Sequence, residues 1–208
     1  MRSFVKLLPL LTIVSCAAPR HDPAEANRGT GVVPAFAPKY TEDGKLIRPG
    51  GYETWIFVGA SIGLGYSESS NPSTGPGVFH NVYTQHEAYE EFGRTGSFPE
   101  KTLFILALYE PRQRESINRQ GYFEGDPVAL EVAVKDREQF QDGWAYFDFG
   151  KGGLDASASA KPTESCHSCH KEHGAADNVF VQFYPSLRGL TNRGWENRGS
   201  QTHRPATP

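Results

Sequence analysis

Cysteine, methionine and excess charge are all scarce in this 208-residue chain. It has three cysteines, one methionine and a formal net charge of −3 at pH 7. Three cysteines cannot build the multi-disulfide framework of a small secreted domain. The near-neutral balance and the lack of a basic run exclude an electrostatic basis for binding nucleic acid. The length instead fits one domain with a hydrophobic core of its own.

Two of the three cysteines lie in the run Cys166-His167-Ser168-Cys169-His170. This CxxCH spacing is the attachment signature of a c-type haem. Two thiols one helical turn apart can add to the vinyl groups on one edge of a porphyrin, and the following histidine can bind the iron. The motif therefore predicts one heme c per chain, attached covalently through Cys166 and Cys169, with His170 as the proximal iron ligand.

Three other interpretations of the motif stay open. The two cysteines could form a redox disulfide, although that motif usually belongs to a βαβ pattern, which the sequence lacks. They could bind zinc with His170 and His173, although no second ligand pair follows at zinc-finger spacing. They could also be two inert thiols, which an exported chain rarely keeps. The motif and the export signal together favour haem.

The scarcity of methionine bears on the sixth ligand of the iron. Met1 is the only methionine, and it lies in a segment that export would remove. The mature protein then cannot use the His/Met ligation of ordinary electron-carrying cytochromes. The sixth position is therefore expected to be empty or to hold water or another side chain, for which His80, in a predicted strand, is a candidate.

Residues 1–16 predict a signal peptide. A basic start is followed by an apolar run over residues 7–14 that is too short to span a membrane. The run ends in Ile13-Val14-Ser15-Cys16, which resembles a bacterial lipobox with Cys16 as the lipidated residue. Cleavage of an ordinary signal peptide after Ala17 or Ala18 is the alternative. We expect an outer-membrane lipoprotein that faces the periplasm, where bacteria attach c-type haem, and that contacts the membrane only through its lipid anchor.

The rest of the chain divides into a tether, one domain and a tail. Residues 17–49 are rich in Pro, Gly, Ala and Asn and predict a flexible tether. Residues 50–187 predict the haem domain, and residues 188–208 predict a polar tail. Within the domain, strand patterns come first and helical patterns last. This order favours an α+β fold with a mostly antiparallel sheet, a few helices and a C-terminal haem-binding helix.

The individual elements follow from local patterns. Strands are predicted at residues 52–58, 78–83, 102–109, 122–123, 128–134 and 144–149. Thr84 and Glu87 match a capping box with Thr84 as N-cap, and the helix they open is expected to stop near Gly93 or Gly96. Apolar residues at helical spacing predict a further helix over residues 177–187.

Several segments, in the same order, resemble the cytochrome P-460 family. They are residues 55–59, 79–83, 130–136, 143–147, 166–170 and 177–185. The resemblance implies a mostly antiparallel β domain, usually a homodimer, with one c-type haem per chain and an open distal face. It also implies two branches. Cytochromes P-460 proper carry a lysine bonded to the porphyrin and oxidise hydroxylamine, with nitrous oxide as a product, whereas the β-sheet cytochromes c′ bind nitric oxide or carbon monoxide in an apolar distal pocket.

The resemblance places the cross-linking lysine near Leu106, within the strand at 102–109. That strand contains no lysine, although Lys101 lies just before it. Phe104 and Leu106 make the strand apolar, and a distal pocket lined by them and His80 would favour neutral diatomic ligands. We therefore predict binding of small nitrogen oxides such as nitric oxide. Hydroxylamine oxidation, with a separate redox partner, and simple electron transfer are the alternatives.

Glu131 alternates with apolar neighbours and so faces the opposite side of its strand from Leu130 and Val132. A glutamate on a sheet face is most often solvated. The resemblance implies instead a proton relay over the distal face. A carboxylate in an apolar site has a raised pKa and can pass protons during oxidation of an N–H substrate. Both interpretations of Glu131 stay open.

Overall fold

The structure is a computed structural model, and it describes residues 36–65 and 75–190. Its elements are β1 (Leu46–Ile47), η1 (Tyr52–Thr54), β2 (Ile56–Ile62), β3 (Phe79–Thr84), α1 (His86–Thr95), β4 (Leu103–Arg112), β5 (Phe123–Lys135), β6 (Trp144–Lys151), β7 (Ser157–Ala158), α2 (His167–His173), η2 (Val181–Phe183) and α3 (Pro185–Arg188). None of the helices in these two ranges is long and apolar enough to cross a membrane.

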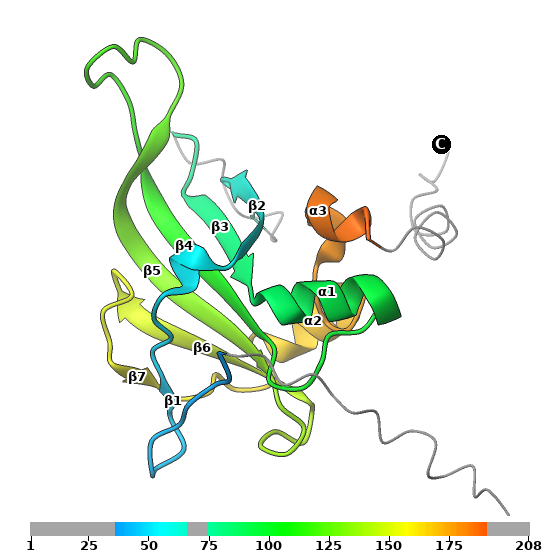
Figure 1. Ribbon diagram of the computed structural model, residues 1–208. Coiled ribbons are helices and arrows are strands. Elements are labelled where there is room, and N and C mark those ends of the chain that lie inside the picture. Colours follow the sequence, from blue (N-terminus) through cyan, green and yellow to red (C-terminus); the bar gives the residue numbers. More distant parts are fainter. Residues whose placement is uncertain (1–35, 66–74, 191–208) are drawn as a thin grey trace, which may run out of the picture. The chain divides into compact units, whose positions relative to one another are not determined.

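The five long strands form one antiparallel sheet in the order β2-β3-β4-β5-β6 (Figure 1). Neighbours in the sequence are therefore neighbours in the sheet, which needs no crossover connection. With the helices added, the fold is α+β and mostly antiparallel, so the predicted fold class is confirmed. Alternate residues of each strand point to opposite faces, and each face has its own core.

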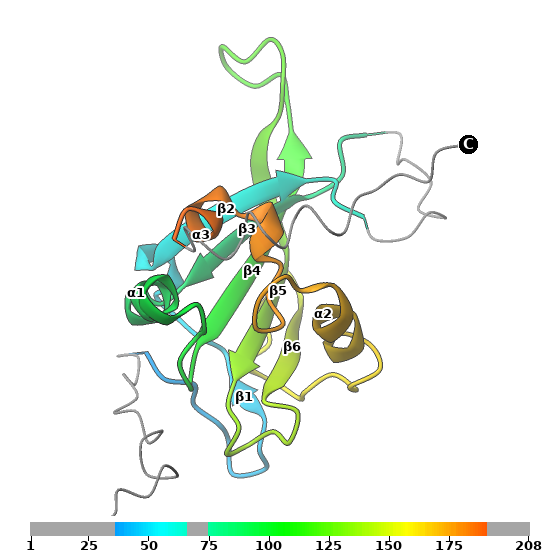
Figure 2. The same ribbon diagram turned by 90° about the vertical axis from the view of Figure 1, so that its right-hand side faces the viewer.

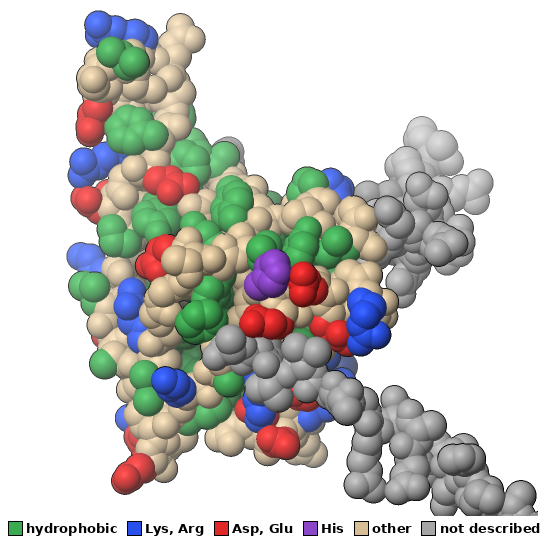
Figure 3. Space-filling model, viewed as in Figure 1, with side chains coloured by type: hydrophobic (Ala, Val, Ile, Leu, Met, Phe, Trp, Pro, Cys, Tyr) green, Lys and Arg blue, Asp and Glu red, His purple; other side chains and the backbone are tan. Residues whose placement is uncertain are grey.

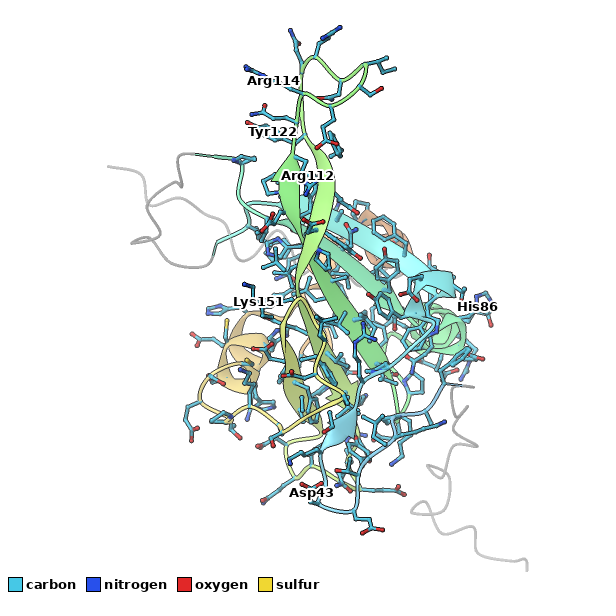
Figure 4. The ribbon with its side chains drawn as sticks, turned by 90° about the vertical axis from the view of Figure 1, so that its left-hand side faces the viewer. Asp43, His86, Arg112, Arg114, Tyr122 and Lys151 are labelled. Atoms are coloured by element: carbon cyan, nitrogen blue, oxygen red, sulfur yellow. The ribbon has the colours of Figure 1, made fainter. Side chains whose placement is uncertain are left out.

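The N-terminal segment closes one face of the sheet. Leu46 of β1 pairs with Ala158 of β7, and both are buried against apolar side chains of the central strands, such as Ile105 and Val132. Asp43, in the turn before β1, marks this segment in Figure 4. The prediction of a flexible tether up to residue 49 is therefore wrong for this part, because Leu46 is fully buried.

The three α-helices lie on the other face of the sheet (Figure 2). Phe92 of α1 stacks on Phe98, with ring centroids 4.2 Å apart, and Phe98 meets Phe104 of β4 edge to face at 4.9 Å. Leu187 of α3 is fully buried in the same core. These contacts hold the helical layer against this face of the sheet.

Two strand predictions differ from the structure. Residues 52–54 form a 3₁₀ turn, and the strand begins only at Ile56. Phe123 and residues 128–134, predicted in two separate strands, belong to one strand, β5, which has an irregular pairing with β4 near Pro127. A proline has no N–H for the hydrogen bonds of a sheet, so Pro127 predicts a break between two strands.

The predicted capping box is also wrong. The N-cap of α1 is Gln85, without a side-chain capping bond, because Thr84 is still part of β3. The Thr84 hydroxyl donates to the Leu103 carbonyl at 2.9 Å, across the strand pair. The helix ends at Gly96 with φ 77°, the left-handed C-cap that glycine favours.

The predicted helix over 177–187 is replaced by shorter turns. Asp177 and Asn178 have φ values of 49° and 59°, which no α-helix can contain. After this left-handed turn come only η2 and the single turn of α3, which Pro185 begins. Val179 and Phe180 are buried, but Phe183 is 43% exposed, so the apolar residues at helical spacing do not form one buried face.

The β4–β5 hairpin extends past the other strands as an arm (Figures 1 and 4). Arg112 and Tyr122 lie along it, and Arg114 lies close to its tip (Figure 4). An ion pair of 2.8 Å between Arg112 and Asp126 joins its two strands. On the face seen in Figure 3, acidic and basic side chains are intermixed, so this face carries no large patch of a single charge.

Burial of Leu46 predicts that the N-terminal segment stabilises the domain. Leu46→Ala should lower the free energy of unfolding by about 2–5 kcal/mol, the usual cost of such a cavity. Ile47→Ala is the matched control, because Ile47 is 40% exposed on the other side of the same strand and should cost far less. Denaturant unfolding of the haem-loaded protein measures both, and equal, small effects would mean that this segment is a tether after all.

Candidate functional site

A cavity of about 420 Å³ lies on the helix-covered face of the sheet, beside α2. Its volume is in the range of about 300–1,000 Å³ that is usual for ligand sites. Two rows of directly paired residues cross its floor. One row contains Val82, Leu106, Glu131 and Asp148, and the other contains Phe104, Ala133 and Tyr146. Phe104 and Leu106, the distal-pocket candidates named from the sequence, both line this cavity.

The CxxCH motif forms the cavity's wall. Cys166 is the N-cap of α2 and Cys169 lies in its first turn, so the three-residue spacing puts both thiols on the same side of the helix. Both are half-buried, free thiols that line the cavity together with His170. The helix thus presents the three residues of the motif to one space.

His170 is held in one orientation and one tautomer. Its Nδ1 lies 2.9 Å from the carbonyl oxygen of Asn178. A carbonyl can only accept, so Nδ1 carries the proton and the lone pair is left on Nε2. Burial lowers the pKa of His170, and the bond to Asn178 partly opposes this. The imidazole is therefore kept in the neutral form that binds metals.

Two aromatic rings enclose His170. The rings of Tyr146 and Phe180 have their centroids 4.4 and 4.5 Å from that of His170. The hydroxyl of Tyr146 is buried and has no hydrogen-bond partner among the described residues. Burial raises the pKa of Tyr146, so the hydroxyl keeps its proton and remains a donor. Tyr146 lines the cavity, so its hydroxyl is available to donate to a group bound there.

Three charged side chains lie at one edge of the cavity. Glu131 on β5 is directly opposite Asp148 on β6, and Lys161 Nζ is 3.0 Å from Asp148 Oδ2. Glu131 is exposed at this edge of the cavity. Partial loss of hydration beside neighbouring protein atoms and the charge of Asp148 raise its pKa, whereas Lys161 lowers it. The hydrogen bond from Lys161 lowers the pKa of Asp148. Glu131 is thus the carboxyl group suited to take up and release a proton.

Sequence reasoning identified Glu131 but missed Asp148, Lys161 and Tyr146. The alternation in residues 144–149 was a usable signal, because it puts Asp148 and Tyr146 on one face of β6. Nothing local marks Lys161, which comes from the loop before the motif. Only the tertiary fold brings that loop to the cavity.

His80 does not reach the cavity. His80 pairs with Leu108, whereas the cavity residue Val82 pairs with Leu106. His80 is therefore two residues from Val82 along β3, a distance of about 7 Å. Its Nδ1 lies 3.4 Å from the Ser61 hydroxyl, and burial lowers its pKa. His80 is not among the residues that line the cavity, so the structure gives no support for it as a distal residue or sixth ligand.

Lys101 is held elsewhere too. Its Nζ is 2.6 Å from Asp136 Oδ1 and 2.9 Å from Glu138 Oε2, on the loop after β5. It is not among the residues that line the cavity, whereas Lys161 is. A register shift that offers Lys101 to the cavity is therefore not observed.

The residues around the cavity fit a c-type haem better than zinc. In residues 36–65 and 75–190, no group of three or more His, Cys, Asp or Glu side chains is arranged to hold a metal ion. His173, the fourth ligand that zinc would need, is exposed beside Glu172. The two thiols, the open Nε2 of His170, the aromatic walls and the donor of Tyr146 match what a covalently attached porphyrin requires.

Comparison with known proteins agrees with this site. The family model described as cytochrome P460 matches residues 49–181, which include the whole sheet and the CxxCH motif. A search of the curated proteins found no match. The match covers more than half of the chain and ends just beyond the turn that holds His170. The chain therefore belongs to the cytochrome P460 family and is a c-type haem cytochrome.

Proposed function

We propose that this protein is an exported mono-haem cytochrome whose open distal iron site binds small nitrogen oxides such as nitric oxide. The observation that carries the proposal is the apolar wall of Val82, Phe104 and Leu106 in the cavity that also contains His170. A wall without hydrogen-bond donors favours neutral diatomic molecules over water and anions. The absence of a lysine on β4 supports the same conclusion.

Each residue of the motif has a separate task in this proposal. Cys166 and Cys169 would form the two thioether bonds to the haem, and His170 would bind its iron through Nε2. The bound haem supplies an iron that takes up small ligands and exchanges single electrons. Tyr146 offers its hydroxyl as a buried donor, and Phe104 and Leu106 keep water out. His170 is the one imidazole among the described residues that line the cavity, which supports an open sixth position.

Oxidation of hydroxylamine is a second candidate, and Glu131 favours it. Removing electrons from an N–H substrate also releases protons, which a carboxylate of raised pKa can accept. Asp148 and Lys161 lie beside Glu131 at the solvent-facing edge of the cavity, so a released proton would have a short way to solvent. In this case a redox partner must take the electrons. By resemblance to the family, we propose a homodimer for either function.

Covalent attachment and an open iron site are tested together. The mass of the purified protein should exceed that of the chain by one haem, and Cys166→Ala/Cys169→Ala should lose the covalent link. The ferrous spectrum should be high-spin and should change when nitric oxide or carbon monoxide is added. His80→Ala should have no effect on it.

Two results would contradict this prediction. A low-spin spectrum in both redox states that His80→Ala converts to high-spin would favour simple electron transfer. A strongly red-shifted ferrous Soret band, with a mass showing the loss of further hydrogens, would mean that a lysine is bonded to the haem. Lys161, which lines the cavity, would then be the candidate for the cross-linked lysine, and hydroxylamine oxidation would become the favoured function.

The two candidate functions are separated by Glu131→Gln, which keeps the shape of the side chain and removes its titration. If the protein oxidises hydroxylamine with an artificial acceptor, Glu131→Gln should lower kcat about 10²–10⁴-fold. The active form of Glu131 is the unprotonated one, so activity should rise with pH through its raised pKa, and this limb should vanish in the variant. Binding of nitric oxide should be nearly unchanged.

Glu110→Gln is the matched control, because Glu110 is exposed on β4 away from the cavity. It should leave turnover and its pH profile unaltered. Wild-type protein that binds nitric oxide but shows no turnover would leave gas binding as the function. Robust turnover that Glu131→Gln does not change would remove the proton-relay role.

We further propose that the chain is exported and held at the outer membrane, facing the periplasm, by a lipid on Cys16. Residues 1–16 lie outside the described residues, so the sequence pattern supports this proposal. Cys16→Ser should move the protein from the membrane fraction to the soluble periplasmic fraction while haem attachment is retained. Wild-type protein in the soluble fraction, cleaved after Ala17 or Ala18, would exclude the lipid anchor.

A further inference from the structure

A buried ion pair lies behind the motif, outside the cavity. The side chain of Lys135, the last residue of β5, is only 4% exposed, and its Nζ is 2.6 Å from Asp177 Oδ2. Lys135 Nζ also donates to the Phe98 carbonyl at 2.6 Å. A lysine is rarely buried in this way, and burial of two charges is costly unless their geometry is well satisfied. The roles assigned above to the cavity residues leave this pair without a function.

The pair holds one side of the left-handed turn at residues 176–179. The backbone N–H of Phe98 donates to the same Asp177 oxygen at 2.9 Å, and Trp144 Nε1 lies 3.4 Å from the other oxygen. The Asp177 carboxylate is thus held from β5, from β6 and from the loop before β4. Because the turn needs positive φ at Asp177 and Asn178, such outside contacts are what keep it in place.

The other side of the turn contacts the proximal histidine. The Asn178 carbonyl accepts from His170 Nδ1 at 2.9 Å, and the Asn178 side-chain amide lies 3.3 Å from His167 Nε2. Two residues of α2 are therefore tied to Asn178, and Asn178 is adjacent to Asp177. A continuous path of contacts connects Lys135 to the imidazole that binds the iron.

We propose that Lys135 and Asp177 are positioning residues for the proximal ligand, which hold the Asn178 carbonyl against His170 Nδ1–H and so set the iron's reduction potential. This inference rests on the proposed ligation by His170. An acceptor held firmly on Nδ1–H makes Nε2 more basic, and a more basic ligand stabilises ferric iron. Loss of the ion pair loosens the acceptor, which lowers the basicity of Nε2 and shifts the equilibrium toward ferrous iron.

The test uses the full-length, haem-loaded protein with Lys135→Met and, separately, Asp177→Asn. Both variants should shift the ferric–ferrous equilibrium about tenfold toward ferrous iron, which is a rise of about 59 mV for one electron. Both should also lower the iron–histidine stretching frequency in the resonance Raman spectrum of the ferrous protein. Asp177→Asn is nearly isosteric and tolerates positive φ, so it carries the test if Lys135→Met does not fold.

Lys101→Met is the matched control. It breaks an ion pair of the same 2.6 Å length to the buried Asp136, and among the described residues no hydrogen bond or ion pair joins these two side chains to the turn at 176–179. It should lower stability and leave the potential and the stretching frequency at their wild-type values. If Lys135→Met and Asp177→Asn behave in the same way as this control, the ion pair is only structural and the proposal is overturned.

Failure of the underlying ligation gives a different result. Wild-type ferrous protein would then show no iron–histidine band that disappears in His170→Ala. That outcome would refute His170 as the ligand, and with it both the proposed site and this inference. A band that His170→Ala removes, but that Lys135→Met and Asp177→Asn leave unshifted, would refute the inference alone.

Discussion

The hydrogen bond from His170 Nδ1 to the Asn178 carbonyl is the contact on which the site depends. It selects the tautomer, leaves Nε2 with its lone pair, and ties α2 to a turn that the sheet holds in place. A seven-residue helix has little stability of its own, so its orientation has to come from such tertiary contacts. Without this bond the CxxCH motif would still offer two thiols, but the imidazole would be free to present either nitrogen to the cavity.

The alternation of side chains along the strands lets one sheet serve two purposes. Leu130 and Val132 contribute to the core under the N-terminal segment, while Glu131 between them faces the cavity. A carboxylate is therefore placed beside the CxxCH motif without a charge entering the core. The same division explains why the cavity combines an apolar wall with a charged edge. Its floor is made of rows of cross-strand neighbours, and each row can carry its own chemistry.

The parts of the site that the sequence predicts are those encoded locally. CxxCH needs only its own spacing, and the alternation in β5 assigns Glu131 to the face opposite Leu130 and Val132 without knowledge of the fold. Phe104 and Leu106 come instead from the resemblance to the family, because their strand is an apolar run without alternation. The missed features depend on distant partners. Thr84 satisfies a capping pattern but bonds across β3 and β4, and residues 177–187 have helical spacing but begin in a left-handed turn held by Lys135 and Phe98. His80 is on the same face of β3 as the cavity residue Val82, but it is two residues further along the strand. Only the register of β3 against β4 shows this.

The burial of Leu46 also limits how far the domain can stand from a membrane. If Cys16 carries a lipid, only about 20 residues separate the anchor from Phe36, whose carbonyl accepts a hydrogen bond from Gln85 Nε2 at 3.1 Å and is thus held on the domain. Even fully extended, that length reaches at most about 70 Å, whereas a tether up to residue 49 would reach roughly 115 Å. A redox partner or a source of nitrogen oxide would therefore have to meet this cytochrome close to the inner surface of the outer membrane.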